Sequence, residues 1–215
     1  MSRAPAPAGL RGPNAVDGPA ATGGKWLRVR ADVAAALPGW VVARVVVLGA
    51  LAVAHVVAAR VDLRLPGYSE RLSRGLLAWD GRWYLDIARE GYEALPDESL
   101  RFFPLYPLLG RAFSPLFGGH VGAALLAVSN LSALALGALV HRLCLTETDD
   151  PALARRAAWL VALVPPFFVT VMGYSEPLAL ALAVWCFSAL RRGSWGWAAV
   201  AGLLAGFVRP VGILL

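Results

Sequence analysis

The 215-residue chain is 58% hydrophobic and only 16% charged, and its mean hydropathy is +0.61. A soluble globular domain carries about 45–50% apolar residues, glycine included, and about 25% charged residues. The composition therefore excludes a disordered chain and argues against a water-soluble domain. Several apolar stretches approach the ~20 residues that an α-helix needs to cross a bilayer, so we predict an all-α, polytopic membrane protein.

The net charge of +6 comes from 20 Lys and Arg against 14 Asp and Glu. The arginines are scattered and mostly sit at the ends of apolar segments, which is typical of membrane proteins, so nucleic acid ranks lowest among the partners considered. Cys144 and Cys186 fall at or inside apolar segments without the spacing of a metal or redox motif. We interpret both as small hydrophobic residues.

Residues 1–37 are rich in Ala, Pro and Gly and contain no apolar run, so we predict a disordered cytoplasmic tail there and a transmembrane domain over 38–215. The first spanning helix is expected from about Trp40 to Ala59. Arg44 lies near its start and is expected to extend its guanidinium to the near interface.

Residues 60–101 form the one long polar stretch, and we predict an outer loop there. It holds eight of the fourteen acids. Within it, Trp79, Trp83 and Ile87 are spaced four apart, which places them on one face of a helix that Gly91 would end. We therefore predict an amphipathic helix at the membrane surface.

The segment Phe102–Phe117 is apolar but contains three prolines and Arg111, so we predict an interfacial or re-entrant segment rather than a crossing helix. Four further spans are expected: from about Val121 to Leu143, from Pro151 to Met172 with a kink at Pro165-Pro166, from Glu176 to Arg191, and from Trp195 to Leu215. With five spans in all, the positive-inside rule places the N-terminus in the cytoplasm and residues 60–101 outside.

On this topology Asp80, Glu176 and Arg209 meet on the outer side. Each has a second interpretation. Asp80 could merely solvate an interfacial helix, and Glu176 could be a helix-start acid stabilised by the macrodipole. Arg209, roughly fourteen residues into a predicted span, could extend to the interface, although intramembrane charge is costly and is functional by default.

The order of several motifs resembles the PIG-V type mannosyltransferases, members of the GT-C class of multi-spanning glycosyltransferases. The motifs are Trp79-Asp80-Gly81-Arg82-Trp83-Tyr84, Glu90-Gly91-Tyr92, Phe102-Phe103-Pro104-Leu105-Tyr106-Pro107-Leu108-Leu109, Val128-Ser129-Asn130-Leu131 and Gly173-Tyr174-Ser175-Glu176-Pro177. The resemblance covers about Gly75 to Leu215. It implies a polyprenyl-phosphate mannose donor, a glycan or glycolipid acceptor, and inversion at the anomeric carbon.

Carried onto this sequence, the resemblance gives Asp80 the acceptor side of the reaction. Such a step requires a carboxylate as general base and cations near the departing phosphate. Asp80 fits the first role, and Glu176 is the second predicted catalytic acid. The candidates for phosphate, sugar or lipid contact are Arg82, Arg101, Arg209, Trp79 and Tyr106, with an interfacial aromatic belt as the alternative for the two aromatic residues. No cofactor and no obligatory metal are predicted.

Because the members of this family are longer and have more spans, we expect this chain to be an N-terminal part of the enzyme. We expect it in the plasma membrane. A partner subunit is possible. The alternative from another class is a non-catalytic transporter or scaffold subunit. A glycosyltransferase would gather Asp80, Glu176 and Arg209 beside a lipid-facing groove. A transporter would line a path across the midplane with polar residues, whereas Ser129, Asn130 and Ser132 are expected to mediate helix packing.

Overall fold

The computed structural model describes residues 19–60 and 68–215, and this part of the chain is all-helical. The α-helices are α1 (Pro19–Arg60), α2 (Tyr68–Arg74), α3 (Asp80–Glu90), α4 (Leu105–Phe113), α5 (Val121–Thr148), α6 (Pro151–Leu163), α7 (Glu176–Arg191) and α8 (Trp195–Val208). The short 3-10 helices are η1 (Gly75–Leu77), η2 (Asp97–Arg101), η3 (Ser114–Phe117), η4 (Pro165–Thr170) and η5 (Pro210–Leu214).

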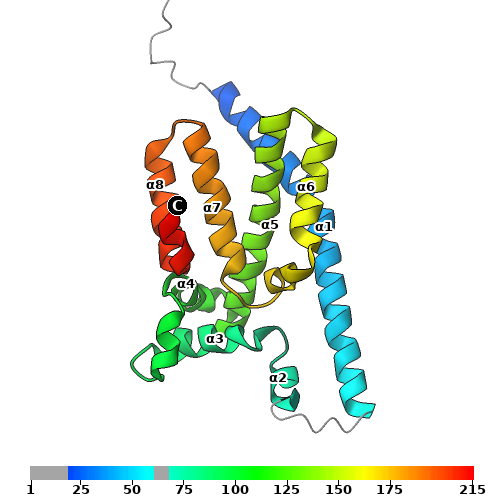
Figure 1. Cartoon of the computed structure of the whole chain (residues 1–215), viewed down its shortest axis with the longest axis vertical. Helices are drawn as coiled ribbons and strands as arrows, with labels where there is room; N and C mark the ends of the chain where they lie inside the picture. Colours follow the sequence, from blue (N-terminus) through cyan, green and yellow to red (C-terminus); the bar gives the residue numbers. More distant parts are fainter. Residues whose placement is uncertain (1–18, 61–67) are drawn as a thin grey trace, which may run out of the picture.

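Five helices form an upright bundle, and the short helices gather at one end of it (Figure 1). In the bundle α1 packs against α5 and α6, α5 against α7, and α7 against α8. Helices α2, α3 and α4 lie across one end, which we call the loop end. The other end, where the first turns of α1 and the α7–α8 turn lie, is called the opposite end.

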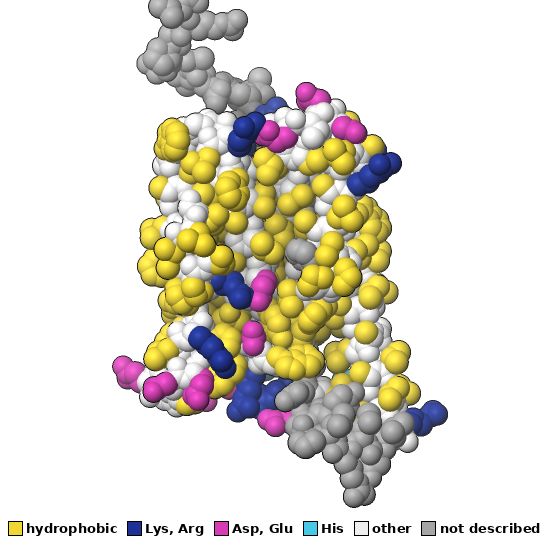
Figure 2. Space-filling view, viewed as in Figure 1, with side chains coloured by type: hydrophobic (Ala, Val, Ile, Leu, Met, Phe, Trp, Pro, Cys, Tyr) yellow, Lys and Arg dark blue, Asp and Glu magenta, His cyan; other side chains and the backbone are white. Residues whose placement is uncertain are grey.

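Between the two ends the surface is apolar. Figure 2 shows hydrophobic side chains over most of this face, with charged side chains mainly near the two ends. Large residues such as Val45 (65% exposed), Val53 (62%) and Leu131 (66%) point outward. Lipid, not water, covers an apolar surface of this extent, and α1 and α5 contain the two segments, Trp26–Arg60 and Val121–Thr148, long and apolar enough to cross a membrane.

The five predicted spans are not reproduced as five long helices. In the described residues α6, α7 and α8 have 13, 16 and 14 residues, fewer than the ~20 of a complete crossing. The predicted kink at Pro165-Pro166 is a break instead: α6 ends at Leu163, and Val164 adopts an extended ψ of 134°. Pro165 causes this because its ring disfavours the helical conformation for the preceding residue.

Helix α1 begins earlier than predicted. It starts at Pro19, so residues 19–37, which the composition assigned to a disordered tail, are helical; residues 1–18 lie outside the described part. A tertiary contact stabilises this part of α1. Buried Asp32 lies 2.8 Å from His141 Nδ1 and accepts a 2.8 Å hydrogen bond from Arg142 Nε, and both partners are on α5. Composition alone does not reveal a contact over this sequence distance.

At the loop end, the predicted helix is present as α3, and Gly91, at φ 85°, ends it. Its buried face differs from the predicted one. Tyr84, Ile87 and Ala88 are buried, whereas Trp79 precedes the helix and is 56% exposed. The segment 102–117 forms the nine-residue α4 and then η3, which confirms that it is not one crossing helix.

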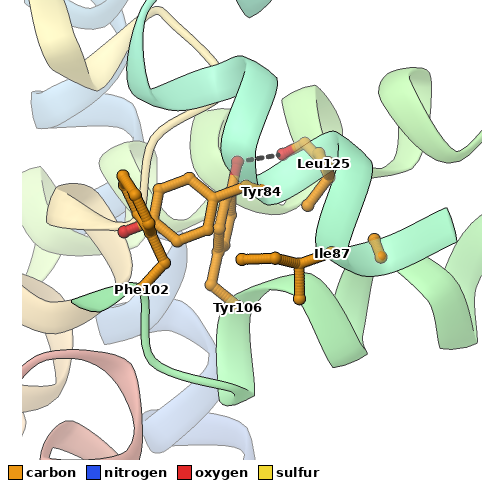
Figure 3. Packing of buried hydrophobic residues seen from close by; sticks show 6 residues of the cluster. Tyr84, Ile87, Phe102, Tyr106 and Leu125 are labelled. Atoms are coloured by element: carbon orange, nitrogen blue, oxygen red, sulfur yellow. Dashed lines mark hydrogen bonds between the residues drawn. The ribbon is translucent and has the colours of Figure 1, made fainter. Parts of the chain in front are cut away.

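An aromatic cluster fixes α3 and α4 to the first turns of α5 (Figure 3). The ring of Tyr84 meets those of Phe102 and Tyr106 edge-on, with centroids 5.1 and 4.8 Å apart. The Tyr106 hydroxyl donates a 2.9 Å hydrogen bond to the carbonyl of Leu125. Aromatic pairs of this kind contribute about 0.5–1.5 kcal/mol each beyond their buried area, so the cluster holds α3 in a defined position.

Candidate active site

The segment from Thr170 to Ser175 leads into α7 and is anchored through its backbone. Three consecutive carbonyls accept hydrogen bonds from side chains of α1 and α5: Thr170 from Arg44 (2.8 Å), Val171 from Asn130 (3.1 Å) and Met172 from Ser129 (2.7 Å). Backbone outside a helix needs such partners where water is excluded. The segment is therefore held in one conformation.

Arg44 takes part in this anchoring and does not extend to an interface, which corrects its predicted role. Its Nε donates to Asn130 Oδ1 (2.8 Å), its Nη1 to the Trp40 carbonyl (3.1 Å), and its guanidinium lies 4.1 Å from the centre of the Trp40 ring. Asn130 and Ser129 bind neighbouring elements, as predicted for packing residues. These polar groups are satisfied inside the protein and do not line a path across it.

The anchored segment is joined directly to the start of α3. The backbone N–H of Gly173 donates to the Leu76 carbonyl (2.9 Å), and the Tyr84 hydroxyl lies 2.6 Å from Ser175 Oγ. A Cβ at position 173 would lie 2.6 Å from a methyl of Leu77, so a larger residue there would displace the Leu77 side chain. The first turns of α3 and α7 are therefore held beside one another.

Each of these two helices begins with an acidic residue. Asp80 is the first residue of α3 and is exposed, and Glu176 is the first residue of α7. Helix N-termini favour negative charge, so acidic side chains suit both positions. The alternative interpretation of Glu176, a helix-start acid, describes its position correctly but leaves its partners unexplained.

The pKa values of two tyrosines, Tyr84 and Tyr174, depend on the charged groups around them. Burial raises the pKa of Tyr84 to about 12, and the negative charges of Glu176 and Asp80 add to this shift. The hydrogen bond with Ser175 and the positive charge of Arg209 oppose it. Burial likewise raises the pKa of Tyr174 to about 12, with Asp80 as the next contributor. Asp80, Glu176 and Arg209 thus all lie within electrostatic reach of one buried hydroxyl.

Arg209 is not inside a helix, contrary to prediction. It follows α8 in an extended conformation (φ −152°, ψ 149°), because Pro210 disfavours helix at the residue before it. From this position Arg209 Nη1 donates to Glu176 Oε1 in an ion pair. The end of helix α8 before Arg209 therefore directs the guanidinium of Arg209 toward the start of α7.

The Glu176–Arg209 pair leaves hydrogen-bonding capacity unused. Glu176 Oε2 is buried without a hydrogen-bond partner among the described residues. Within the same part of the chain, Arg209 donates only through Nη1. Buried polar atoms are almost always paired, so an unpaired acceptor beside unused donors is the arrangement expected where a ligand binds.

Arg82 and Arg101 lie elsewhere at the loop end. Arg82 Nε is 3.3 Å from Asp86 Oδ2, and its Nη1 is 3.9 Å from a Glu70 oxygen. The guanidinium of Arg101 lies 5.3 Å from the Phe102 ring centre and 5.8 Å from that of Trp83. In the described residues neither arginine forms an ion pair with Glu176, so the structure brings only Arg209 to that acid.

The two aromatic candidates differ in exposure. Trp79 precedes Asp80, is exposed, and has a φ of 52°, which is unusual for a bulky residue. Tyr106 has no exposed surface, and its hydroxyl is bonded to Leu125. The predicted substrate contact of Tyr106 is therefore corrected to a role in the core beneath the site.

An apolar cavity of about 660 Å³ runs along α7 and α8, and Phe103 at the loop end also lines it. Gly212, another lining residue, lies against Ala205 of α8 and donates its backbone N–H to the Arg209 carbonyl (2.9 Å), so the cavity comes close to the backbone of Arg209. No group of three or more His, Cys, Asp or Glu that could hold a metal ion occurs in residues 19–60 and 68–215.

Sequence reasoning assigned no role to Tyr84, Tyr174 or Ser175, although all three stand inside the quoted motifs. A family model described as "Mannosyltransferase (PIG-V)" matches residues 43–214, a range that includes Asp80, Glu176 and Arg209. Comparisons with curated proteins and with solved structures give no match.

Proposed function

The chain belongs to the PIG-V family of membrane mannosyltransferases, and on that premise we propose that it transfers mannose from a polyprenyl-phosphate donor to a hydroxyl of a glycan or glycolipid, with inversion. Family membership favours an enzyme over the transporter or scaffold alternative. One observation supports this chemistry in particular: Asp80, Glu176 and Arg209 approach a single buried tyrosine from the starts of α3 and α7 and the end of α8.

The reaction is a single displacement. The acceptor oxygen attacks the anomeric carbon of the donor, the bond from that carbon to the phosphate oxygen breaks, and polyprenyl phosphate leaves with the electron pair. Asp80 takes the proton of the acceptor hydroxyl. Its exposed position at the loop end suits this role, because an acceptor can reach it from the aqueous side.

Arg209 stabilises the leaving phosphate. A guanidinium matches phosphate with two parallel donors, and Arg209 retains Nε and Nη2 for that purpose in the described structure. Glu176 orients this guanidinium through Oε1, while Oε2 remains for a hydroxyl of the bound sugar or acceptor. Glu176 therefore acts by positioning, and Asp80 acts on the reacting atoms.

The polyprenyl chain of the donor lies in the apolar cavity along α7 and α8. Its lining includes Cys186, Leu203 and Phe207 and lacks charged residues. Because this cavity reaches Gly212, a lipid lying in it places its phosphate near Arg209. Exposed Trp79 is the aromatic surface available to the sugar.

We also propose the topology. Helices α1 and α5 cross the membrane fully, and α6 with η4, α7 and α8 complete five crossings, with η5 folded back against α8. The N-terminus is cytoplasmic, and the loop end faces outward from the plasma membrane. The transmembrane domain begins within α1 and continues to residue 215.

The substitution Asp80→Asn tests the mechanism. It keeps the shape of the side chain but removes the base, so the initial rate of mannose transfer should fall by about 10²–10⁴-fold. The rate is measured in membranes with radiolabelled polyprenyl-phosphate mannose and a glycolipid extract as acceptor. Asp86→Asn, in the same helix but paired with Arg82, is the matched control and should retain the rate. Wild-type transfer by Asp80→Asn would exclude this mechanism.

A further inference from the structure

A second, larger cavity lies on a different side of the bundle. It has a volume of about 930 Å³ and lies between α1, α5 and α7. Apolar residues such as Val29, Leu139 and Leu182 line most of it, and its polar lining residues are Arg28, Asp32, Ser132, Arg142 and Arg192. The proposed mannose transfer uses none of these residues.

The cavity is polarised along its length. Arg28 is near the start of α1, Arg142 near the end of α5, and Arg192 directly after α7, so all three belong to the opposite end of the bundle (Figure 1). From there the cavity extends along α7 as far as Leu178, a distance of about 21 Å at 1.5 Å per helical residue. A cationic end and a long apolar body match the shape of a phospholipid.

The charges of the lining favour an anion. Asp32 is the acid among them, and both its oxygens are already bonded, to His141 and to Arg142. Arg28 and Arg192 are exposed and form no ion pair within the described residues, whereas neighbouring Arg191 is held by Glu147. The lining therefore offers free guanidinium groups but no free carboxylate for the ammonium of a zwitterionic lipid.

We propose that this cavity is a binding site for one anionic glycerophospholipid. Its phosphate lies among Arg28, Arg142 and Arg192, and an acyl chain follows α5 and α7 toward Leu178. Basic pockets between membrane helices bind anionic head groups in this way, and arginine pairs with phosphate through two donors. The three arginines lie at the end away from Arg209, so the phosphate bound there is not that of the mannose donor.

The experiment compares two lipids on the purified protein in detergent. Dioleoyl-phosphatidylglycerol should raise the midpoint of thermal unfolding more than dioleoyl-phosphatidylcholine, and native mass spectrometry should retain one phosphatidylglycerol per chain. The double substitution Arg28→Gln/Arg192→Gln should weaken the phosphatidylglycerol complex about 10- to 30-fold. Both arginines are exposed, so the variant is expected to fold.

The matched control is Arg155→Gln/Arg156→Gln, which removes two exposed cations of α6 that do not line the cavity. It should bind phosphatidylglycerol like the wild type. Equal stabilisation by the two lipids, full binding by the Arg28/Arg192 variant, or equal loss in the control would each overturn the proposal. None of these readouts depends on mannose transfer, so failure here is distinct from failure of the proposed function.

Discussion

Two ion-paired clusters at opposite ends of the molecule differ in how fully their atoms are bonded. At the opposite end, both oxygens of Asp32 accept hydrogen bonds, one from His141 and one from Arg142. At the loop end, Glu176 uses one oxygen for Arg209 and leaves the other buried and unpaired. A saturated cluster joins helices, whereas an unsaturated one is prepared for a ligand, so substitutions in the two should have different consequences.

The largest effect is expected at the unsaturated cluster. Arg209→Gln removes the charge that we propose stabilises the leaving phosphate, so transfer should fall by about 10²–10³-fold. The transfer rate of Arg209→Lys, which keeps the charge but lacks the planar guanidinium group, should fall less. The initial rate with labelled donor is the measurement. Arg82→Gln, at the same end but paired with Asp86 and Glu70, serves as comparison; a loss there equal to that of Arg209→Gln would contradict the assignment.

The saturated cluster should govern stability. Asp32→Ala leaves Arg142 and His141 without their acceptor and should lower the free energy of unfolding by about 3 kcal/mol. The transfer rate of the molecules that remain folded should not change. Thermal unfolding in detergent measures the first quantity and a rate normalised to folded protein the second. The control is Asp97→Ala, at an exposed position. A normal unfolding midpoint for Asp32→Ala would contradict the stabilising role of the saturated cluster.

Arg44 connects stability with the site. Arg44→Met keeps an unbranched, flexible side chain but removes the Arg44 hydrogen bonds to the Thr170 carbonyl and Asn130 Oδ1, at a cost of about 1–3 kcal/mol. Because the segment that carries Glu176 loses an anchor, kcat should fall more than KM rises, and Arg44→Lys should restore part of it. Arg60→Met, at the exposed end of the same helix, should behave like the wild type. A change in unfolding alone would make Arg44 purely structural.

The smallest effect concerns Tyr84. Its folded pKa of about 12 exceeds the usual value of 10.0, so the phenol stays protonated in the fold while the unfolded chain releases the proton above about pH 10. The stability linked to this group is therefore fully present below pH 10 and is lost as the pH rises through 12. Unfolding midpoints from pH 9 to 12 should fall less steeply for Tyr84→Phe; identical slopes would contradict the shift.

The candidate site residues could be singled out from the sequence, whereas the groups that surround them could not. Asp80, Glu176 and Arg209 were identifiable because charge is scarce in this chain and because two of them stand in family motifs. The roles of Arg44 and Asp32 were not, since their partners lie 86 to 126 residues away for Arg44 and 109 to 110 for Asp32. No local pattern encodes such pairings.

Tyr106 and Trp79 illustrate the same limit at shorter range. An interfacial aromatic residue looks alike in sequence whether it is buried or exposed, and only the packing of α3 on α4 and α5 separates the two. The break at Arg209 was predictable in principle, because a proline follows it. The apolar run from Trp195 concealed it by favouring one continuous helix.

The three anchored carbonyls at residues 170 to 172 set an order for biogenesis. During synthesis α1 enters the membrane with Arg44 bonded within its own helix, to the Trp40 carbonyl, and the Thr170 carbonyl that Arg44 also binds is made 126 residues later. Asn130 and Ser129 are made in between. The candidate active site is therefore completed only when η4 has been inserted beside helices already in place. The ribosome must have passed the start of α7 before the first helix reaches its final hydrogen bonding.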